Sequence, residues 1–423
     1  MKQYDSYKDS GIEWIGEVPS HWEIVPLKFT GEFGNGLTYS PKDVVDYGIW
    51  VLRSSNIQNS SLSFEDNVYV SNVSKALLVQ KGDVIICSRN GSAALVGKSA
   101  FIDKDINATF GAFMMRYIPK INKKYGFYLF QTAIGRYKGY FATTTINQLT
   151  KSTIGEMKVP LANTEEQTAI VDFLDNKCSE IDKVISAQQK RIALLQELKQ
   201  SVITHAVTKG LNPNVEMKDS GVEWIGEVPS HWEIVPLKFT GKFGNGLTYS
   251  PKDVVDYGIL VLRSSNIQKS SLSFEDNVYV SNVSKALLVQ KGDVIICSRN
   301  GSAALVGKSA FIDKDINATF GAFMMRYIPK INKKYGFYLF QTAISRYKGY
   351  FATTTINQLT KSTIGEMKVP LANTEEQTAI VDFLDKKCAS IDSSISKAQH
   401  QVELLQEYKQ SLITEVVTGK RKV

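Results

Sequence analysis

Apolar residues recur at spacings of three and four positions near the end of each half of this chain. The first series is Leu174, Cys178, Ile181, Ile185, Ile192, Leu195 and Val202, and the second is Leu384, Cys388, Ile391, Ile395, Ala398, Val402, Leu405 and Leu412. No Pro or Gly interrupts residues 164–208, and Thr164-Glu165-Glu166-Gln167 is typical of a helix start. These patterns predict two long helices, over 164–208 and 374–418, each with a coiled-coil seam.

The predicted length of these helices indicates their partners. A helix of about 44 residues is about 66 Å long, which exceeds what one globule of about 150 residues can cover. We therefore expect each seam to pack against the other helix, with packing on the adjoining globule as the alternative. The connection from Thr208 to Val215 is too short for the return path that parallel pairing needs. The two helices are predicted to be antiparallel.

The sequence before each long helix alternates short apolar runs with polar turns. In the first half, the runs that predict strands are Trp50–Leu52, Leu62–Phe64, Asn67–Val70, Val84–Cys87 and Ala100–Ile102. Clusters of Gly, Asn, Ser and Asp separate them, as in hairpins and loops. Residues 124–140 carry apolar positions on one helical face and predict a helix. The fold class predicted is α+β, with two mixed α/β domains joined by two long antiparallel helices.

The two halves are copies of one module. Residues 8–178 recur at 218–388 with an offset of 210. The six differences are Ile12/Val222, Glu32/Lys242, Trp50/Leu260, Asn59/Lys269, Gly135/Ser345 and Asn176/Lys386. Two near-identical modules suit a target with two identical halves, such as inverted DNA half-sites; a recent duplication without such a target is the alternative. The expected boundaries are 1–163 and 209–373 for the domains, 164–208 and 374–418 for the helices, and 419–423 for a frayed basic tail.

Composition narrows the class of partner. The 423 residues carry a formal net charge of +8, which favours a polyanionic partner without demonstrating one. The four cysteines form no CxxC pair and only four histidines are present, so no zinc site is predicted. No run of 18 apolar residues and no signal peptide are visible, which predicts a cytoplasmic protein without membrane association.

Motifs for catalysis are weak. Residues 91–99 resemble a phosphate-binding loop, but five residues separate the glycines where the pattern has four, and a strand is expected to follow. Gly34-Asn35-Gly36 lacks the third glycine of a dinucleotide site and predicts a turn. His21 and His231 are expected to pack or cap. No HExxH or GxSxG pattern occurs, so the sequence offers no constellation from which to build an enzyme.

Three polar loops in each copy carry the residue types that contact DNA. Arg53–Gln58 and Arg89–Ser92 each follow a predicted strand, and Thr143–Lys151 forms the third loop. Arg can pair with guanine, and Asn or Gln with adenine. The candidate DNA-binding residues are Arg53, Ser54, Ser55, Asn56, Arg89, Asn90, Thr144, Asn147, Gln148 and Lys151, with Arg263, Ser264, Ser265, Asn266, Arg299, Asn300, Thr354, Asn357, Gln358 and Lys361.

Several further segments occur in both copies: residues 7–22, 146–151, 158–161 and 165–167 have the same features within 217–232 and 356–377. Together these segments resemble the specificity subunits of Type I restriction-modification systems. The resemblance covers essentially the whole chain. It implies a non-catalytic DNA-reading subunit whose two target recognition domains are held apart by an antiparallel helix pair. Two features depart from the family: its members usually carry two dissimilar domains, and Ala162-Asn163 stands where they have two prolines.

The resemblance also implies partners and cofactors. Such subunits recruit two methyltransferase subunits that bind S-adenosylmethionine, and often two ATP-driven restriction subunits. This chain itself is expected to need no cofactor, and its DNA is expected to be double-stranded. The alternatives are a stand-alone tandem-repeat DNA-binding regulator or scaffold, and an enzyme with an unrecognised site. Because the candidate loops are identical in both copies, we predict an interrupted palindrome as the target. Of the six differences, Trp50/Leu260 is the one most able to alter the sequence of one half-site.

Overall fold

The computed structural model describes residues 3–137, 148–347 and 358–423. The chain folds into two compact units. Unit 1 comprises Met1–Gln189 with His400–Val423, and unit 2 comprises Lys190–Gln399. Each unit therefore contains one globule and a part of both long helices. Within the described residues, no helix is long and apolar enough to cross a membrane.

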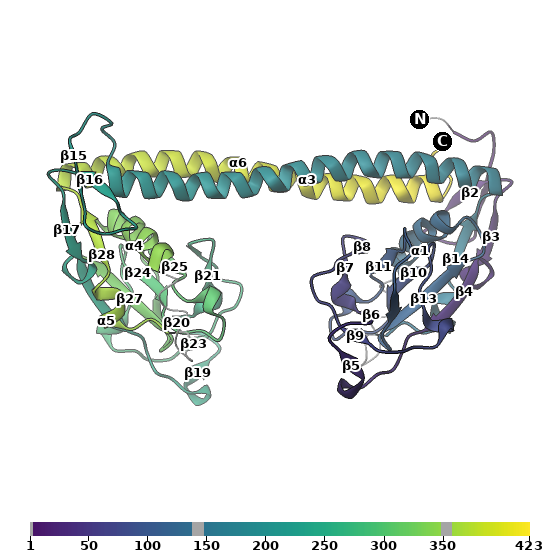
Figure 1. Ribbon diagram of the computed structural model, residues 1–423, viewed down its shortest axis with the longest axis horizontal. Coiled ribbons are helices and arrows are strands. Elements are labelled where there is room, and N and C mark those ends of the chain that lie inside the picture. The colour runs from purple at the N-terminus through teal and green to yellow at the C-terminus, as the bar shows by residue number, and fades with distance from the viewer. Residues whose placement is uncertain (1–2, 138–147, 348–357) are drawn as a thin grey trace. The chain divides into compact units, whose positions relative to one another are not determined.

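Two four-stranded sheets form the centre of the unit 1 globule (Figure 1). The first has the order β11-β10-β13-β4 and is antiparallel, and the second has the order β12-β6-β9-β5 with β12 parallel to β6. Their strands are β4 (Gly31–Asn35), β5 (Val44–Val45), β6 (Ile49–Leu52), β9 (Tyr69–Val70), β10 (Val84–Cys87), β11 (Ser99–Phe101), β12 (Ala108–Phe110) and β13 (Met114–Pro119). Three strand pairs complete the globule: β1 (Tyr7–Asp9) with β2 (Glu17–Pro19), β3 (Glu23–Pro26) with β14 (Lys158–Leu161), and β7 (Ile57–Gln58) with β8 (Ser61–Leu62).

Strand β10 is buried on both faces, which explains why its sequence is an unbroken apolar run. Val84 and Ile86 belong to the larger core, and Ile85 and Cys87 to a smaller core shared with β6 and β12. A strand buried on both faces needs apolar side chains at every position. Helix α1 (Lys123–Tyr137) packs against the first sheet, and the short helix α2 (Lys151–Gly155) precedes β14 (Figure 1).

The long helices are α3 (Thr164–Lys209) and α6 (Thr374–Val417), close to the bounds predicted from sequence. Asn163 caps α3, because its Oδ1 accepts a hydrogen bond from the Glu166 amide at 2.9 Å. In unit 1, Arg421 lies 5.3 Å from the Phe173 ring, and Lys409 Nζ lies 2.7 Å from Asp182 Oδ2. The higher-numbered residue of α3 thus contacts the lower-numbered residue of the α6 segment. The two helices therefore run antiparallel, as predicted.

The seam of α3 also packs on its own globule. In unit 1, Leu174 and Cys178 are buried in one core together with Tyr125 of α1 and Leu412 of α6. The alternative partner considered for the seam is therefore used as well. The first turns of α3 cover the globule, and the same turns contact the end of α6.

Unit 2 repeats these elements. They are β15 (Met217–Asp219), β16 (Glu227–Pro229), β17 (Glu233–Pro236), β18 (Gly241–Asn245), β19 (Val254–Val255), β20 (Ile259–Leu262), β21 (Ile267–Gln268), β22 (Ser271–Leu272), β23 (Tyr279–Val280), β24 (Val294–Cys297), β25 (Ser309–Phe311), β26 (Ala318–Phe320), β27 (Met324–Pro329), α4 (Lys333–Tyr347), α5 (Lys361–Gly365) and β28 (Lys368–Leu371). Here Lys199 of α3 and Asp392 of α6 form the ion pair, at 2.6 Å.

Two sequence predictions about local structure are wrong. The basic tail is docked rather than frayed: Lys422 Nζ lies 5.4 Å from the Tyr4 ring, and the Arg421 amide donates to Glu415 O at 3.2 Å. The Gly34-Asn35 pair ends strand β4 instead of forming a turn, because the β13 ladder pairs Gly34 with Arg116 and Asn35 with Met115. The residues after the phosphate-loop-like segment do form a strand, β11, as expected.

Candidate nucleic-acid interface

In unit 1, polar loops from distant parts of the sequence meet where the central strands end. Asn90, after β10, donates from Nδ2 to Ser54 Oγ, after β6, at 3.1 Å. Arg89 forms an antiparallel bridge with Gln148, and its Nε donates to Gln148 Oε1 at 3.1 Å. The described parts of the three predicted loops thus contact one another. In unit 2, Asn300 donates to Ser264 Oγ at 3.1 Å, and Arg299 forms the same bridge with Gln358.

A tight turn between β12 and β13 holds these loops in place. Gly111 donates from its amide to Leu52 O at 3.0 Å, where β6 leads into the Arg53 loop. Phe113 O accepts from the Ser88 and Arg89 amides at 2.9 and 3.1 Å. A Cβ on Gly36 would lie 2.1 Å from Gly111 O, so the neighbouring segment must carry glycine there. Backbone hydrogen bonds therefore set the relative positions of the loops.

Asn56 is a candidate that the structure assigns to another role. Its side chain is fully buried; Oδ1 accepts from the Arg53 amide at 2.9 Å, and Nδ2 donates to Asp66 O at 2.9 Å. Asn266 is buried in the same arrangement. A fully buried side chain whose donor and acceptor are both used inside the loop is not accessible to DNA in this conformation. We therefore remove Asn56 and Asn266 from the candidate contacts.

Arg53 and Ser55 face an acidic neighbour, Asp66. Arg53 Nη2 lies 2.5 Å from Asp66 Oδ1. Hydrogen bonds from Ser55 and then Arg53 hold the pKa of the Asp66 carboxyl below its usual value. Ser55 is exposed, and Arg263 pairs with Asp276 in the same way at 2.6 Å. Any DNA phosphate or base that Arg53 contacts has to compete with this carboxylate.

An aromatic residue that the sequence analysis overlooked lies beside Arg89. The Arg89 guanidinium carbon is 5.7 Å from the centre of the Phe113 ring, and in unit 2 Arg299 is 5.4 Å from Phe323. Both rings are largely exposed, at 59% and 61%. The signal in the sequence is a Phe directly after Gly-Ala in the link between two strands, and this short link lacks the polar residues that mark the other loops.

The remaining candidates lie at the third loop. Thr144, Asn147, Thr354 and Asn357 are outside the described residues. Lys151 and Lys361 are exposed at the first positions of α2 and α5. The N-cap of α2 is Thr150, whose Oγ1 accepts from the Thr153 amide at 3.1 Å. Lys151 therefore projects from a capped helix start directly after the bridge at Gln148.

The histidines and cysteines have structural surroundings. His21 Nε2 lies 2.9 Å from Glu166 Oε2, which also accepts from Trp22 Nε1 at 3.0 Å. This contact fixes the module's opening segment to the start of α3, as expected for a packing histidine. Burial raises the pKa of all four cysteine thiols, so they are poor nucleophiles at neutral pH. No group of three His, Cys, Asp or Glu in the described ranges is placed to hold a metal ion.

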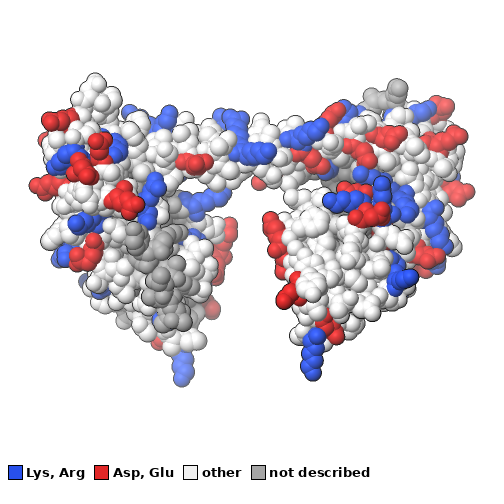
Figure 2. All heavy atoms as spheres, viewed as in Figure 1, with Lys and Arg blue, Asp and Glu red and all other residues white. Residues whose placement is uncertain are grey.

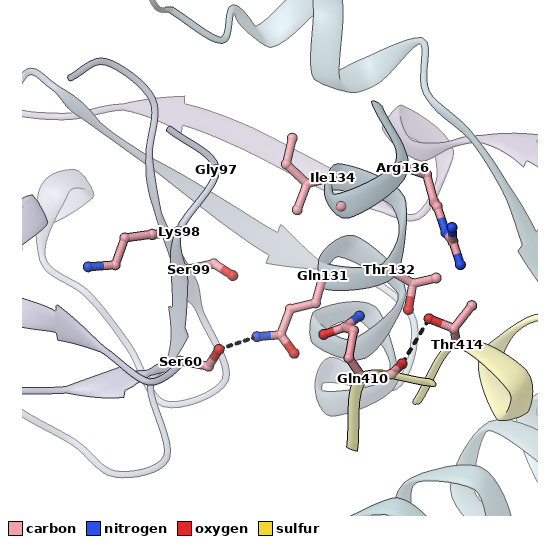
Figure 3. Close-up of a pocket in the computed structure, with 11 residues that line it drawn as sticks. Ser60, Gly97, Lys98, Ser99, Gln131, Thr132, Ile134, Arg136, Gln410 and Thr414 are labelled. Atoms are coloured by element: carbon pink, nitrogen blue, oxygen red, sulfur yellow. Dashed lines mark hydrogen bonds between the residues drawn. The ribbon is translucent and has the colours of Figure 1, made fainter. Parts of the chain in front are cut away.

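A separate cleft of about 460 Å³ in unit 1 lies between β11, α1 and α6. Figure 3 shows Gln131 reaching across to Ser60 Oγ, with a hydrogen bond of 2.7 Å, and the Lys98 side chain extending away from α1. None of the predicted reading residues lines this cleft. The end of the segment that resembles a phosphate-binding loop, residues 97–99, therefore lines one side of this cleft, and the Lys98 side chain points away from α1.

We refer to the described parts of the three polar loops, 53–58, 89–92 and 148–151, as the loop cluster. Figure 2 shows how charge is distributed on one face of the unit that contains it. Figure 2 shows that Lys and Arg on the visible face of unit 1 gather near the helices, while the globule below them is mostly neither acidic nor basic. On this face the basic residues near the helices lie among acidic residues.

Comparison with known proteins identifies the family. Residues 19–193 and 229–404 both match the family model described as the Type I restriction modification DNA specificity domain. The chain belongs to this family. It carries two copies of the DNA specificity domain, and the family's role is recognition of DNA rather than catalysis. Each matched range runs from the start of a globule into its long helix.

Individual relatives agree over different lengths. The chain is 23% identical to the MjaVIII specificity subunit of Methanocaldococcus jannaschii, over 96% of this chain and 94% of that protein. It is 24% identical to the EcoKI specificity subunit of Escherichia coli (strain K12), over 71% of this chain and 66% of that protein. A solved structure concerned with complex assembly and conformational transition of the type I R-M system has the same fold: the TM-score is 0.67 at 15% identity, covering 95% of this chain and 98% of the other.

Proposed function

We propose that this specificity protein directs a Type I adenine methyltransferase complex, with or without restriction subunits, to a bipartite DNA site. The observation that carries the proposal is the meeting of the Arg53, Arg89 and Gln148 loops in each copy of a DNA specificity domain. The recognition domains are residues 1–163 and 209–373, and the helices at 164–208 and 374–418 join them. The proposed DNA contacts are Arg53, Ser54, Ser55, Arg89, Asn90, Thr144, Asn147, Gln148 and Lys151, with Arg263, Ser264, Ser265, Arg299, Asn300, Thr354, Asn357, Gln358 and Lys361.

The partners follow from the family role. The complex would contain double-stranded DNA, two methyltransferase subunits carrying S-adenosylmethionine and, where a restriction gene is present, two ATP-driven restriction subunits. Cofactors would thus bind the partners rather than this chain, and the complex would act in the cytoplasm. Relatives named as specificity subunits of Type I restriction enzymes support these assignments.

Co-expression tests the proposal. The chain is expressed with its neighbouring methyltransferase gene in a host that lacks adenine methylation, and the modified bases are sequenced. We expect one bipartite motif with one methylated adenine on each strand. Arg89→Gln with Arg299→Gln should relax or abolish that motif, because each removed guanidinium takes away a bidentate base contact worth about 1–3 kcal/mol.

Two outcomes would contradict the proposal. A chain that does not co-purify with a methyltransferase would point to a stand-alone regulator. Methylation of DNA by this chain alone would point to an enzyme. Lys28→Gln with Lys238→Gln is the matched control, because each lysine forms a surface ion pair, with Glu156 and Glu366 respectively.

A further inference from the structure

Phe113 and Phe323 combine exposure with fixed position. A single exposed phenyl ring is ordinary on a protein surface, so exposure alone carries no function. Here, however, the backbone of the ring-bearing residue is anchored by hydrogen bonds from Ser88 and Arg89, and the turn is tied to Leu52. The ring is thus held between the loops that follow β6 and β10, in both copies.

The ring also restricts the arginine beside it. The guanidinium carbon lies 5.7 Å from the ring centre in unit 1 and 5.4 Å in unit 2. An arginine placed over a phenyl face is attracted to it by cation–π and dispersion forces. Gln148 Oε1 also accepts from Arg89 Nε, at 3.1 Å, and from Arg89 Nη2, which leaves Nη1 and the second hydrogen of Nη2 free, within the described part of the chain, to donate to a base edge. A guanidinium held on two sides loses less conformational entropy when it pairs with a base edge.

The ring and the guanidinium are far enough apart to contact different base pairs. Stacked base pairs are about 3.4 Å apart, whereas the ring centre and the guanidinium carbon are separated by 5.4–5.7 Å. If the guanidinium pairs with a guanine, the ring is within reach of the next base pair. The only large apolar feature of base edges in the major groove is the 5-methyl group of thymine, which Phe contacts in protein–DNA complexes.

We propose that Phe113 and Phe323 are specificity-determining residues, each orienting the adjacent arginine and packing against the 5-methyl group of a thymine next to the guanine that this arginine reads. The inference rests on the proposed DNA-reading function and adds to it a residue and a base. It requires each half-site to contain a thymine in the base pair beside a guanine. The contact is apolar, so it involves no phosphate and no counterion.

Replacement of thymine by deoxyuridine tests the contact, because deoxyuridine lacks only the methyl group. Duplexes carrying the motif obtained from methylation sequencing are bound by the full chain in complex with its methyltransferase subunit. A duplex in which this thymine is replaced by deoxyuridine in one half-site should bind about fourfold more weakly, the effect of losing one buried methyl group. The Phe113→Ala, Phe323→Ala variant should bind both duplexes equally, with an unchanged salt dependence. Phe113→Leu with Phe323→Leu should retain part of the discrimination.

A matched control is available within the chain. Phe29 and Phe239 are also exposed, at 69% and 67%, and Lys28 and Lys238 lie 5.5 Å from their rings. Phe29→Ala with Phe239→Ala should keep the wild-type preference for thymine. The thermal unfolding midpoint of the Phe113→Ala, Phe323→Ala variant should match the wild type, which separates DNA contact from a structural role.

The outcomes for the inference and for the proposed function are distinct. Discrimination retained by the Phe113→Ala, Phe323→Ala variant, equal loss in the Phe29 control, or a half-site without thymine beside guanine would each overturn the inference alone. A wild-type complex that neither binds nor methylates DNA would overturn the proposed function instead.

Discussion

At the scale of single residues, the hairpin between β7 and β8 shows how the copies differ. Its turn residues Asn59 and Ser60 have φ of 50° and 62°, as a type I′ turn requires, and Lys269 and Ser270 adopt 48° and 63°. Asn tolerates this left-handed conformation, whereas Lys is strained in it. The second copy thus carries a strained turn that the first copy avoids.

Lys269→Asn should therefore stabilise the protein. We expect an increase of about 0.5–1 kcal/mol in the free energy of unfolding of unit 2, measured by denaturant titration. The reverse exchange in the first copy, Asn59→Lys, is the matched control and should destabilise unit 1 by a similar amount. An unchanged stability in both variants would contradict the strain argument.

Sequence reasoning identified loops that come together in the fold, but it did not predict the surroundings of the individual residues within them. Polar loops after apolar strands were recognisable, and they do come together. Burial of Asn56 was not predictable, because an Asn that caps a loop and an Asn that reads a base look alike in sequence. Phe113 was not predicted, because its proposed role depends on the β12–β13 turn, which is hydrogen-bonded to loops that are far away in sequence.

At the scale of elements, the long helices were predictable and several strands were not. Repeating apolar positions over many turns gave bounds for α3 and α6 close to those observed. Strand β4 contains two glycines, and its last two residues, Gly34 and Asn35, were predicted to lie in a turn, yet Phe33 in this strand stacks on Tyr117 of β13 with ring centres 4.8 Å apart. A long-range ladder and one aromatic contact decide this strand, and neither is visible in a short window of sequence.

The same repeat positions form the helix contact in each unit. Asp182 pairs with Lys409 in unit 1, and Asp392 with Lys199 in unit 2; an offset of 210 converts one pair into the other. Likewise, Ile203 and Val207 are buried in the unit 2 core as Ile413 and Val417 are in unit 1. One copy of the module therefore carries both sides of this contact.

A half-length fragment should dimerise for this reason. We expect residues 1–210 to form a dimer in sedimentation, with α3 of each copy covering the seam of the other. Replacing Ile203 and Val207 by Asp should shift the fragment toward monomer, since each change places a charge in an apolar core. A wild-type fragment that stays monomeric at high micromolar concentration would refute this pairing.

At the scale of the whole molecule, the second copy is more basic by four charges: two come from Glu32/Lys242, and one each from Asn59/Lys269 and Asn176/Lys386. Glu32 lies 2.7 Å from Lys120, with both side chains 65% exposed, so this ion pair adds little stability. Glu32 pairs with Ile118 in the β4–β13 ladder, and Ile118 lies near the end of β13 that is farther from Phe113. The first charge difference is therefore remote from the loop cluster.

Lys242→Glu should accordingly leave DNA binding unchanged. Log affinity falls with log salt concentration, and removing a lysine that contacts a phosphate makes this fall shallower by about 0.9. We expect no such change for the full chain in complex with its methyltransferase, measured between low and moderate salt. A slope reduced by about that amount would place Lys242 on the DNA, and Glu32→Lys should then give the opposite change.

The target sequence is the last property that the repeat predicts. The loops at Arg53–Gln58, Arg89–Ser92 and Thr143–Lys151 are identical in the second copy, so both modules should prefer the same half-site. Antiparallel joining by helices predicts that the half-sites are inverted, with an unread spacer of fixed length. The Trp50/Leu260 difference lies in the small core, where Trp50 is 6% and Leu260 is 7% exposed, rather than on the loops. Sequencing of modified bases should therefore yield an interrupted palindrome, unchanged in Trp50→Leu, and a motif with unrelated halves would show that identical loops do not read identical DNA.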